Sequence, residues 1–175
     1  KKLLTKGDIL PSIKLVFPDN DQYREYLGIS EGKSFSVPQI VSDLVIIEIF
    51  SMYCPHCQRE APLVNSFYDK LANDPDLKNR IKLIGIGVGN SDYEVNFFKK
   101  KYDIKFPLFS DPDFKYYEQI GEVRTPFFIG IKIAKDKDKD KDKDDDKAFV
   151  FHTHKGGMEN VDDFLADILN QDVQD

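Results

Sequence analysis

The sequence of 175 residues contains no tryptophan, only two cysteines and no long apolar run. Its longest apolar run, Leu44 to Phe50, is seven residues and includes Glu48, whereas a membrane-spanning helix needs about 20. Basic residues are not in excess either, because 25 Lys and Arg stand against 31 Asp and Glu, for a net charge of −6. Because the longest apolar run is so short, we expect no transmembrane segment in these residues. Because no basic stripe could neutralise phosphates, we also expect no nucleic-acid partner.

The two cysteines are too few and too close together for a disulfide framework. Cys54 and Cys57 form a single C-x-x-C, the spacing of redox-active pairs. Apolar residues make up 41% of the chain and aromatics 13%, which is enough for one core, so we expect a single domain over residues 1–175. Because the chain begins at Lys1 rather than Met, we expect a signal peptide or membrane anchor, if there is one, only in a removed N-terminal segment.

One segment differs sharply from the rest of the chain. Residues 135–147 consist of six Lys and seven Asp. Such a tract has no apolar surface to offset its ordering entropy, so we expect a solvated loop insertion. The runs on either side, 127–134 and 148–154, are rich in β-branched and aromatic residues and have the length of strands. Together they predict a β-hairpin with an expanded loop.

Strand and helix patterns alternate through the remaining chain. Apolar runs typical of buried strands cover 45–50 and 81–88. Helical periodicity covers the ranges 58–72, 92–102, 113–120 and 160–169. Residues 1–40 are less regular and form an N-terminal extension, with a strand predicted at 9–17, a turn at 18–21 and a helical turn at 37–42. The order predicts an α/β fold with a central mixed sheet flanked by helices.

The chemistry is concentrated where the strand 45–50 gives way to the helix. Cys54 opens that helix, so its sulfur lies near free amides and the positive end of the helix dipole, which stabilise a thiolate. Cys54 is therefore the predicted nucleophile. Cys57 lies one turn further and can resolve a mixed disulfide. His56, between them, can add positive charge or a hydrogen-bond donor near the Cys54 sulfur.

These residues and their surroundings resemble the thioredoxin superfamily. Glu48, six residues before Cys54, matches the buried carboxylate that exchanges a proton with the resolving cysteine. Thr125-Pro126, just before the strand 127–134, matches the loop whose cis-proline faces the disulfide and binds the backbone of the substrate. The resemblance therefore implies a thioredoxin-like fold, and roles for Glu48, Thr125 and Pro126 in the site.

Further matches point to one branch of that superfamily. Pro62 corresponds to the proline that kinks the active-site helix, and Gly156-Gly157 to a glycine turn before the last helix. The N-terminal extension and the segment 106–121 are similar to the redoxin or TlpA-like branch, whose members are mostly exported or membrane-tethered. The resemblance thus implies a periplasmic or otherwise extracytoplasmic location. Pro55-His56 instead gives the CPHC motif of DsbA-type oxidases, so the direction of electron flow stays open.

The resulting hypothesis is an enzyme that exchanges disulfides with protein substrates through Cys54 and Cys57. Its partners would be protein thiols or disulfides and a second redox protein that resets the pair, with no organic cofactor and no metal. A peroxiredoxin-type peroxidase is an alternative, because Ser51 and Arg124 fall where that family keeps a hydroxyl and an arginine. However, Ile47 replaces the proline expected there.

A second alternative is the binding or transfer of Cu(I). Met52, Cys54 and Cys57 match the M-x-C-x-x-C of copper chaperone domains, and thiolates suit Cu(I). Those domains are much smaller, and they lack the Thr-Pro that follows in this chain. A structural zinc site would have to recruit His152 and His154, which alternate on a predicted strand and are more typical of a sheet surface.

Simpler structural roles also exist for two of the site residues. Glu48 could meet a lysine at the sheet edge, although its isoleucine neighbours favour burial, where a carboxyl has a raised pKa. Thr125-Pro126 could form an ordinary trans turn. The position of Thr125-Pro126 just before the strand 127–134 favours instead the cis-proline loop that binds the substrate backbone.

Overall fold

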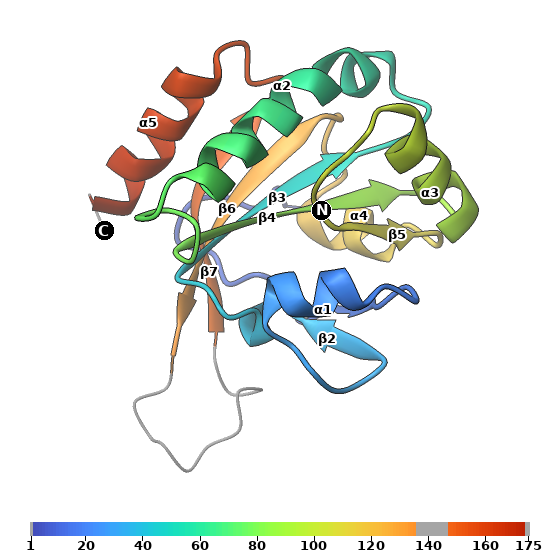
Figure 1. The fold of residues 1–175 in the computed structure, drawn as a ribbon, viewed down its shortest axis with the longest axis horizontal. Coiled ribbons are helices and arrows are strands. Elements are labelled where there is room, and N and C mark those ends of the chain that lie inside the picture. Colours follow the sequence, from blue (N-terminus) through green and yellow to red (C-terminus); the bar gives the residue numbers. More distant parts are fainter. Residues whose placement is uncertain (1, 136–146, 174–175) are drawn as a thin grey trace.

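A five-stranded sheet forms the centre of the protein (Figure 1). The structure is a computed structural model, and it describes residues 2–135 and 147–173. The strand order is β5-β4-β3-β6-β7. The first three of these strands run parallel to one another, whereas β6 is antiparallel to β3 and β7 is antiparallel to β6. The strands are β3 (Leu44–Phe50), β4 (Ile81–Val88), β5 (Leu108–Asp111), β6 (Phe127–Ala134) and β7 (Lys147–Lys155).

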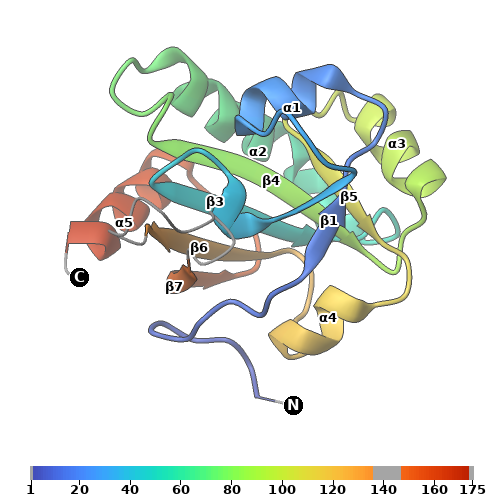
Figure 2. The same ribbon diagram turned by 90° about the horizontal axis from the view of Figure 1, so that it is seen from below.

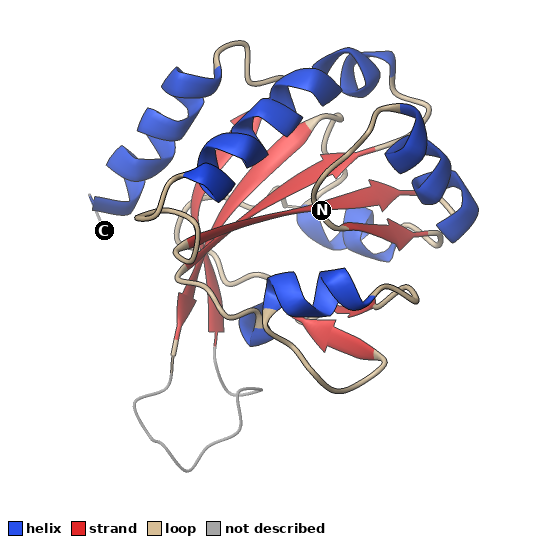
Figure 3. Cartoon of the chain, in the orientation of Figure 1, coloured by secondary structure: helices blue, strands red, loops and turns tan. Residues whose placement is uncertain are grey.

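Helices cover both faces of this sheet (Figures 1 and 3). One face carries α2 (Pro55–Asn73), α3 (Asp92–Lys101) and α5 (Val161–Val173). The other face carries α1 (Asp21–Leu27), α4 (Lys115–Ile120), the 3₁₀ turn η1 (Val37–Gln39) and a two-stranded sheet of β1 (Lys14–Val16) and β2 (Ser34–Ser36). Two core clusters result, one on each side of the sheet.

The sequence of β3 explains why the sheet is covered on both sides. Its side chains alternate, so that Leu44, Ile46 and Phe50 belong to the core under α2. Val45, Ile47 and Ile49 belong to the core on the opposite face. All seven residues of the strand are buried, which is the continuous apolar pattern of a strand with two covered faces. Glu48 has the same parity as Ile46, and it therefore faces α2.

The main elements agree with the patterns in the sequence, and the thioredoxin-like α/β fold is confirmed by this arrangement and by the solved structures compared below. Strands β4 and β6 have the predicted bounds. Strand β5 was not predicted, because only four residues form it. It lies at one edge of the sheet and pairs with β4 alone.

The N-terminal extension is more ordered than its sequence suggests. The strand predicted at 9–17 is wrong in its extent, because only Lys14–Val16 pair with β2. Helix α1 was also missed. It is a short helix of seven residues with only Tyr23 and Leu27 buried, so its periodicity is weak. Asn20 caps the N-terminus of this helix, because its side chain accepts a hydrogen bond from Gln22 N at 3.0 Å.

The first residues of the extension run along the outer edge of β7 (Figure 2). Gly7 N donates to Val150 O and Leu10 N donates to Ala148 O, both at 2.8 Å. Ile9 forms an isolated antiparallel bridge with Phe149. These bonds satisfy part of the edge of β7, which would otherwise present unpaired backbone groups. The same segment brings Leu3 towards the end of α4, where the residue lies against Gly121.

Strands β6 and β7 form the predicted hairpin, and Ala134 pairs with Lys147 where the two strands meet the loop. Most of the Lys/Asp tract, residues 136–146, lies outside the described residues.

Replacing residues 135–146 by Asn-Gly should therefore leave the protein folded and active. A two-residue turn of this type joins antiparallel strands directly. The eight residues of β6 separate the tract from Pro126, a distance of about 25 Å at roughly 3.3 Å per residue. We expect the free energy of unfolding, from denaturant titration, to change by less than about 1 kcal/mol. Any disulfide exchange by Cys54 and Cys57, the activity expected from the sequence, should keep its rate. Loss of exchange at unchanged stability would assign the tract a role in function.

Candidate redox site

Cys54 caps the N-terminus of α2 with its own side chain. The Cys54 backbone is extended, with φ −88°, and its sulfur accepts a hydrogen bond from Cys57 N at 3.1 Å. Pro55 follows at the first helical position, where a missing N–H costs nothing. The sulfur therefore lies at the positive end of a 19-residue helix, among amides that lack partners within the helix.

The loop that leads to Cys54 is held from two sides. Buried Asn90, in the turn after β4, accepts a hydrogen bond from Met52 N at 2.9 Å. Gln58, in the first turns of α2, donates to Met52 O at 2.8 Å. Asn90 also donates to Ser51 Oγ at 3.4 Å. Nothing in the C-x-x-C pattern points to Asn90 or Gln58, and the one available signal for Asn90 is its turn position directly after a central strand.

The two cysteines, both present as free thiols, lie in different environments. Cys54 is half-buried, whereas Cys57 is 1% exposed. Burial raises the pKa of the Cys57 thiol, and its hydrogen bond with Cys54 raises this pKa further. Only Cys54 is thus open to attack from solvent.

Thr125 and Pro126 lie close to Cys54 and line the same pocket. The Cys54 thiol donates to the Thr125 carbonyl, with 3.5 Å between sulfur and oxygen. The Thr125-Pro126 peptide bond is cis. Pro126 is buried and Thr125 is half-buried. The structure therefore brings together the motif around Cys54 and a loop that follows 71 residues later.

Glu48 is a buried carboxyl beneath these cysteines. It is 3% exposed, so it does not meet a lysine at the sheet edge. Burial raises the pKa of Glu48 to about 8, and the nearby carboxylate of Glu60 contributes to this shift. Glu48 also adds to the raised pKa of Cys57. A carboxyl with a pKa near neutrality can both accept and donate a proton under physiological conditions.

Glu60 is a further residue of this site that the sequence analysis did not identify. It is buried in α2, its Oε2 accepts a hydrogen bond from Met158 N at 2.9 Å, and its Oε1 lies 3.9 Å from His56 Nε2. The glycine turn 156–157 makes room for it, because a Cβ on Gly157 would lie 2.3 Å from Glu60 Cδ. The i,i+4 spacing from His56 was the signal available in the sequence.

The residues that a metal would need are not assembled. Among residues 2–135 and 147–173, no group of three or more His, Cys, Asp and Glu side chains could hold a metal ion. His154 Nε2 lies 2.7 Å from Gly157 O, and His152 is half-buried on β7. Met52, which a copper-chaperone motif would use, is partly buried against the core under α2. No helix in the described part of the chain is long and apolar enough to cross a membrane.

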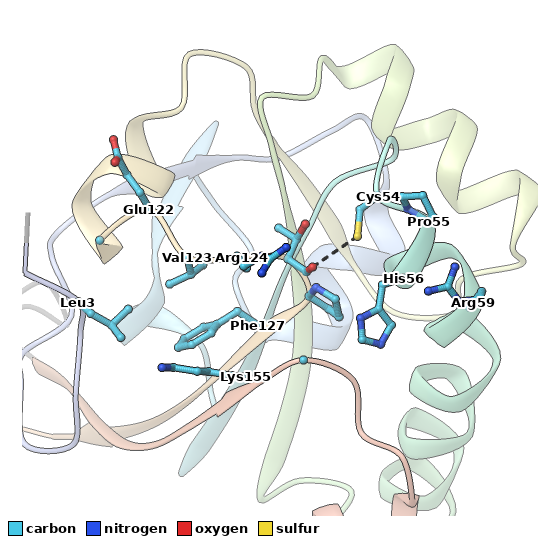
Figure 4. A pocket seen from close by; sticks show the side chains of 14 residues that line it. Leu3, Cys54, Pro55, His56, Arg59, Glu122, Val123, Arg124, Phe127 and Lys155 are labelled. Atoms are coloured by element: carbon cyan, nitrogen blue, oxygen red, sulfur yellow. Dashed lines mark hydrogen bonds between the residues drawn. The ribbon is translucent and has the colours of Figure 1, made fainter.

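A cavity of about 800 Å³ opens beside Cys54 (Figure 4). Pro55, His56 and Thr125 line it near the sulfur. Arg124, one of the two residues that a peroxidase would use, also lines it. The other is Ser51, whose hydroxyl accepts hydrogen bonds from Tyr53 N and Asn90 Nδ2. Cys54 N donates to the Ser51 carbonyl at 3.1 Å, but in the described residues no hydrogen bond joins the Ser51 hydroxyl to the Cys54 sulfur.

This combination of fold and site, a C-x-x-C pair at a helix N-terminus beside a cis-proline, is that of a thioredoxin-like protein. A model of the AhpC/TSA family matches residues 7–142, so the chain belongs to the AhpC/TSA family. It is 25% identical over 96 residues to thiol-disulfide oxidoreductase ResA of Bacillus thuringiensis subsp. konkukian, a match that covers 55% of this chain and 53% of that protein. The chain thus spans about half the length of such relatives.

Two further proteins support this placement. The chain is 28% identical over 123 residues to sporulation thiol-disulfide oxidoreductase A of Bacillus subtilis, covering 63% of this chain and 71% of that protein. The thioredoxin domain of a thiol-disulfide oxidoreductase from Bacteroides vulgatus superposes with a TM-score of 0.64 at 13% identity, covering 96% of this chain and 97% of that domain. The second match is evidence for the fold. The resemblance to the thioredoxin superfamily and its redoxin branch is thereby confirmed.

Brief alkylation of the reduced protein with iodoacetamide at neutral pH should label Cys54 and leave Cys57 unmodified. Cys54 is accessible and Cys57 is buried with a raised pKa, so we expect a rate difference of at least about tenfold. Mass spectrometry of the digested protein locates the label. In a Cys54→Ser control, labelling should require denaturant. A label on Cys57 in the native protein would reverse the assignment of the two thiols.

Glu48→Gln should remove a pH dependence of stability. The pKa of Glu48 is about 8 in the folded protein against 4.5 in the unfolded chain. Between pH 4.5 and pH 8 the folded protein keeps the Glu48 proton, whereas the unfolded chain has lost it. The stability that is fully present below about pH 4.5 is therefore lost as pH rises through 8, and the free energy of unfolding falls. The slope approaches about 1.4 kcal/mol per pH unit.

Denaturant unfolding at several values between pH 5 and 8 tests this expectation. The Glu48→Gln curve should be flatter than that of the unmodified protein, and the variant should be the more stable of the two at pH 8. Glu31→Gln, at an exposed position in the extension, provides a control that should keep the original slope. Parallel curves for Glu48→Gln and the unmodified protein would show that Glu48 is ionised in the folded state.

Proposed function

We propose that this protein is a thiol-disulfide oxidoreductase that exchanges disulfides with protein substrates through Cys54 and Cys57. One observation carries the proposal, namely an accessible Cys54 sulfur at a helix N-terminus that faces the Thr125 carbonyl, with buried Cys57 directly behind it. The names of the Bacillus relatives, which are thiol-disulfide oxidoreductases, support it.

In the reducing direction, the Cys54 thiolate attacks one sulfur of a substrate disulfide. The substrate S–S bond breaks, one substrate thiolate leaves and takes up a proton, and the other sulfur stays bonded to Cys54. Cys57 then loses its proton to Glu48, whose pKa of about 8 suits this transfer. The Cys57 thiolate attacks the Cys54 sulfur, the mixed disulfide breaks, and the leaving substrate thiolate takes up the proton that Glu48 holds. The substrate then carries two thiols and the protein holds the disulfide. In the oxidising direction the same steps run backwards.

The surrounding residues have supporting roles in this proposal. Pro55 starts the helix without losing a hydrogen bond, and His56 provides a donor or a positive charge beside Cys54. The backbone at Thr125, followed by Pro126, holds an extended substrate segment by edge pairing. Glu60 orients His56 through the contact between their side chains.

The exchange chemistry needs no organic cofactor, because both electrons are carried by the cysteine pair. It does need a second redox partner that restores the pair after each turnover. We further propose that the protein works in the periplasm or an equivalent extracytoplasmic compartment, as its resemblance to exported thiol-disulfide oxidoreductases implies.

A thiol peroxidase is the second candidate, favoured by the AhpC/TSA match and by Arg124 at the cavity beside Cys54. Two observations weigh against it. The Ser51 hydroxyl already accepts hydrogen bonds from Tyr53 N and from Asn90. Cys57 lies within the first turn of the helix that Cys54 caps, where it competes for any oxidised form of Cys54.

Cys57→Ser separates the candidates, because removal of the resolving thiol leaves Cys54 bonded to its substrate. We expect the variant to accumulate mixed disulfides with protein substrates, seen as reducible adducts by mass spectrometry. The matched control, Cys54→Ser, should form none. A peroxidase would instead form Cys54 sulfenic acid quickly with dilute peroxide and trap no protein. A Cu(I) carrier would bind the ion in the unmodified protein and lose it in both variants.

A further inference from the structure

We propose that the substrate segment recognised beside Cys54 is acidic: an extended peptide with a disulfide whose flanking residues carry carboxylates, bound by Arg59, Arg124 and Lys155. This inference rests on the proposed function and specifies its substrate class. The evidence is the distribution of charge around the cavity, which is opposite to that of the whole chain.

The cavity has an apolar floor and a polar rim (Figure 4). Leu3, Val123 and Phe127 line it as apolar side chains, while Cys54 and His56 lie at one end. Val123 and Phe127 are buried. At about 800 Å³ the space can take several residues of a peptide rather than a single ion.

Three cations from separate elements converge on this rim. Arg59 comes from α2, Arg124 from the loop before Pro126, and Lys155 from the last position of β7. All three side chains are exposed. In the part of the chain that the structure describes, none of them has an ion-pair or hydrogen-bond partner on its side chain. An incoming carboxylate would therefore compete with no carboxylate already bound to these residues.

The carboxylates near the cavity do not cancel this charge. Glu122 is the one acidic residue that lines it, and Figure 4 shows it at the end away from Cys54 and Arg59. Glu60 lies beneath His56, where it already accepts a hydrogen bond from Met158 N. The positive charge is thus greatest beside the reactive sulfur.

This arrangement contrasts with the rest of the protein. The net charge is −6, and several cations away from the cavity pair with acidic residues, among them Lys105 with Asp69 and Arg80 with Asp172. A chain with excess carboxylates repels acidic partners in general. At the cavity beside Cys54, the local cluster of unpaired cations reverses this repulsion and favours the approach of an acidic segment.

Arginine is suited to such a partner because its planar guanidinium binds a carboxylate through two parallel hydrogen bonds. The apolar floor would at the same time cover an aliphatic part of the segment. Acidic residues beside the substrate cysteine meet Arg59 and Arg124 near Cys54, while a residue further along lies over Val123 and Phe127, beside Lys155.

Kinetics with matched peptides test this proposal. Three short peptides, each closed by one disulfide, differ only in the residues that flank the cysteines: Glu, Gln or Lys. The reduced full chain is mixed with each peptide, and single-turnover reduction is followed by mass spectrometry. We expect the Glu peptide to react about tenfold faster than the Lys peptide at low ionic strength. This ratio should approach one at about 0.5 M salt.

Charge-neutral variants locate the effect. Arg59→Gln, Arg124→Gln and Lys155→Gln should each lower the ratio of Glu to Lys peptide rates roughly two- to threefold, and the triple variant should abolish it. Lys33→Gln, an exposed position that does not line the cavity, is the matched control and should keep the ratio. Because each ratio is taken within one variant, differences in folded fraction cancel.

The outcomes separate this inference from the proposed function. Equal rates for the three peptides would overturn the acidic preference while disulfide exchange stands. Failure to reduce any peptide, with the same preparation folded, would overturn the proposed function itself. Faster reduction of glutathione disulfide than of the Glu peptide would show that the cations serve a small carboxylated disulfide, and would also overturn the proposal of a peptide.

Discussion

The hydrogen bond from Cys57 N to the Cys54 sulfur is the interaction on which the site depends. It uses the reactive atom as the cap of α2, so helix formation and placement of the sulfur are one event. The helix starts where it does because β3 ends at the buried Phe50 and because Asn90 and Gln58 hold Met52 in the connecting loop. A displaced loop would lose both the cap and the alignment with the Thr125 carbonyl.

Beneath that cap, the protein buries two carboxyl groups close to each other. Glu48 lies in the central strand and Glu60 in the helix packed over it, and each disfavours an additional negative charge nearby. Such an arrangement costs stability as pH rises. It also keeps a proton beside the buried Cys57 thiol at a pH where a surface carboxyl would have lost it. The fold thus gives up some stability at the place where the proposed exchange needs a proton donor and acceptor.

The surface around Cys54 is divided into parts with different chemistry. The Thr125 carbonyl offers a backbone contact, Phe127 and Val123 an apolar floor, and three cations a charged rim. These residues come from α2, the loop before β6 and the end of β7, together with the N-terminal segment at Leu3. Substitutions on the rim can therefore alter which disulfides react, while the sulfur chemistry at the α2 N-terminus is kept.

Local sequence by itself determined a large part of this description. The apolar runs at 81–88 and 127–134 predicted two buried strands with the observed bounds, and C-x-x-C after a buried strand predicted that Cys54 lies at a helix N-terminus. The burial of Glu48 was likewise recognisable, because its neighbours Ile46, Ile47 and Ile49 favour a buried strand. In each case the deciding interactions lie within a few residues of the chain.

Only the tertiary structure decided which distant residues meet. The partnership of Glu60 with Met158, the hold of Asn90 on the Cys54 loop and the convergence of Arg59, Arg124 and Lys155 all join segments far apart in sequence. Helix α1 and strand β5 belong to the same class, because they are too short for a periodic pattern and are stabilised by packing against their neighbours. Their formation depends on contacts that exist only once the sheet has assembled.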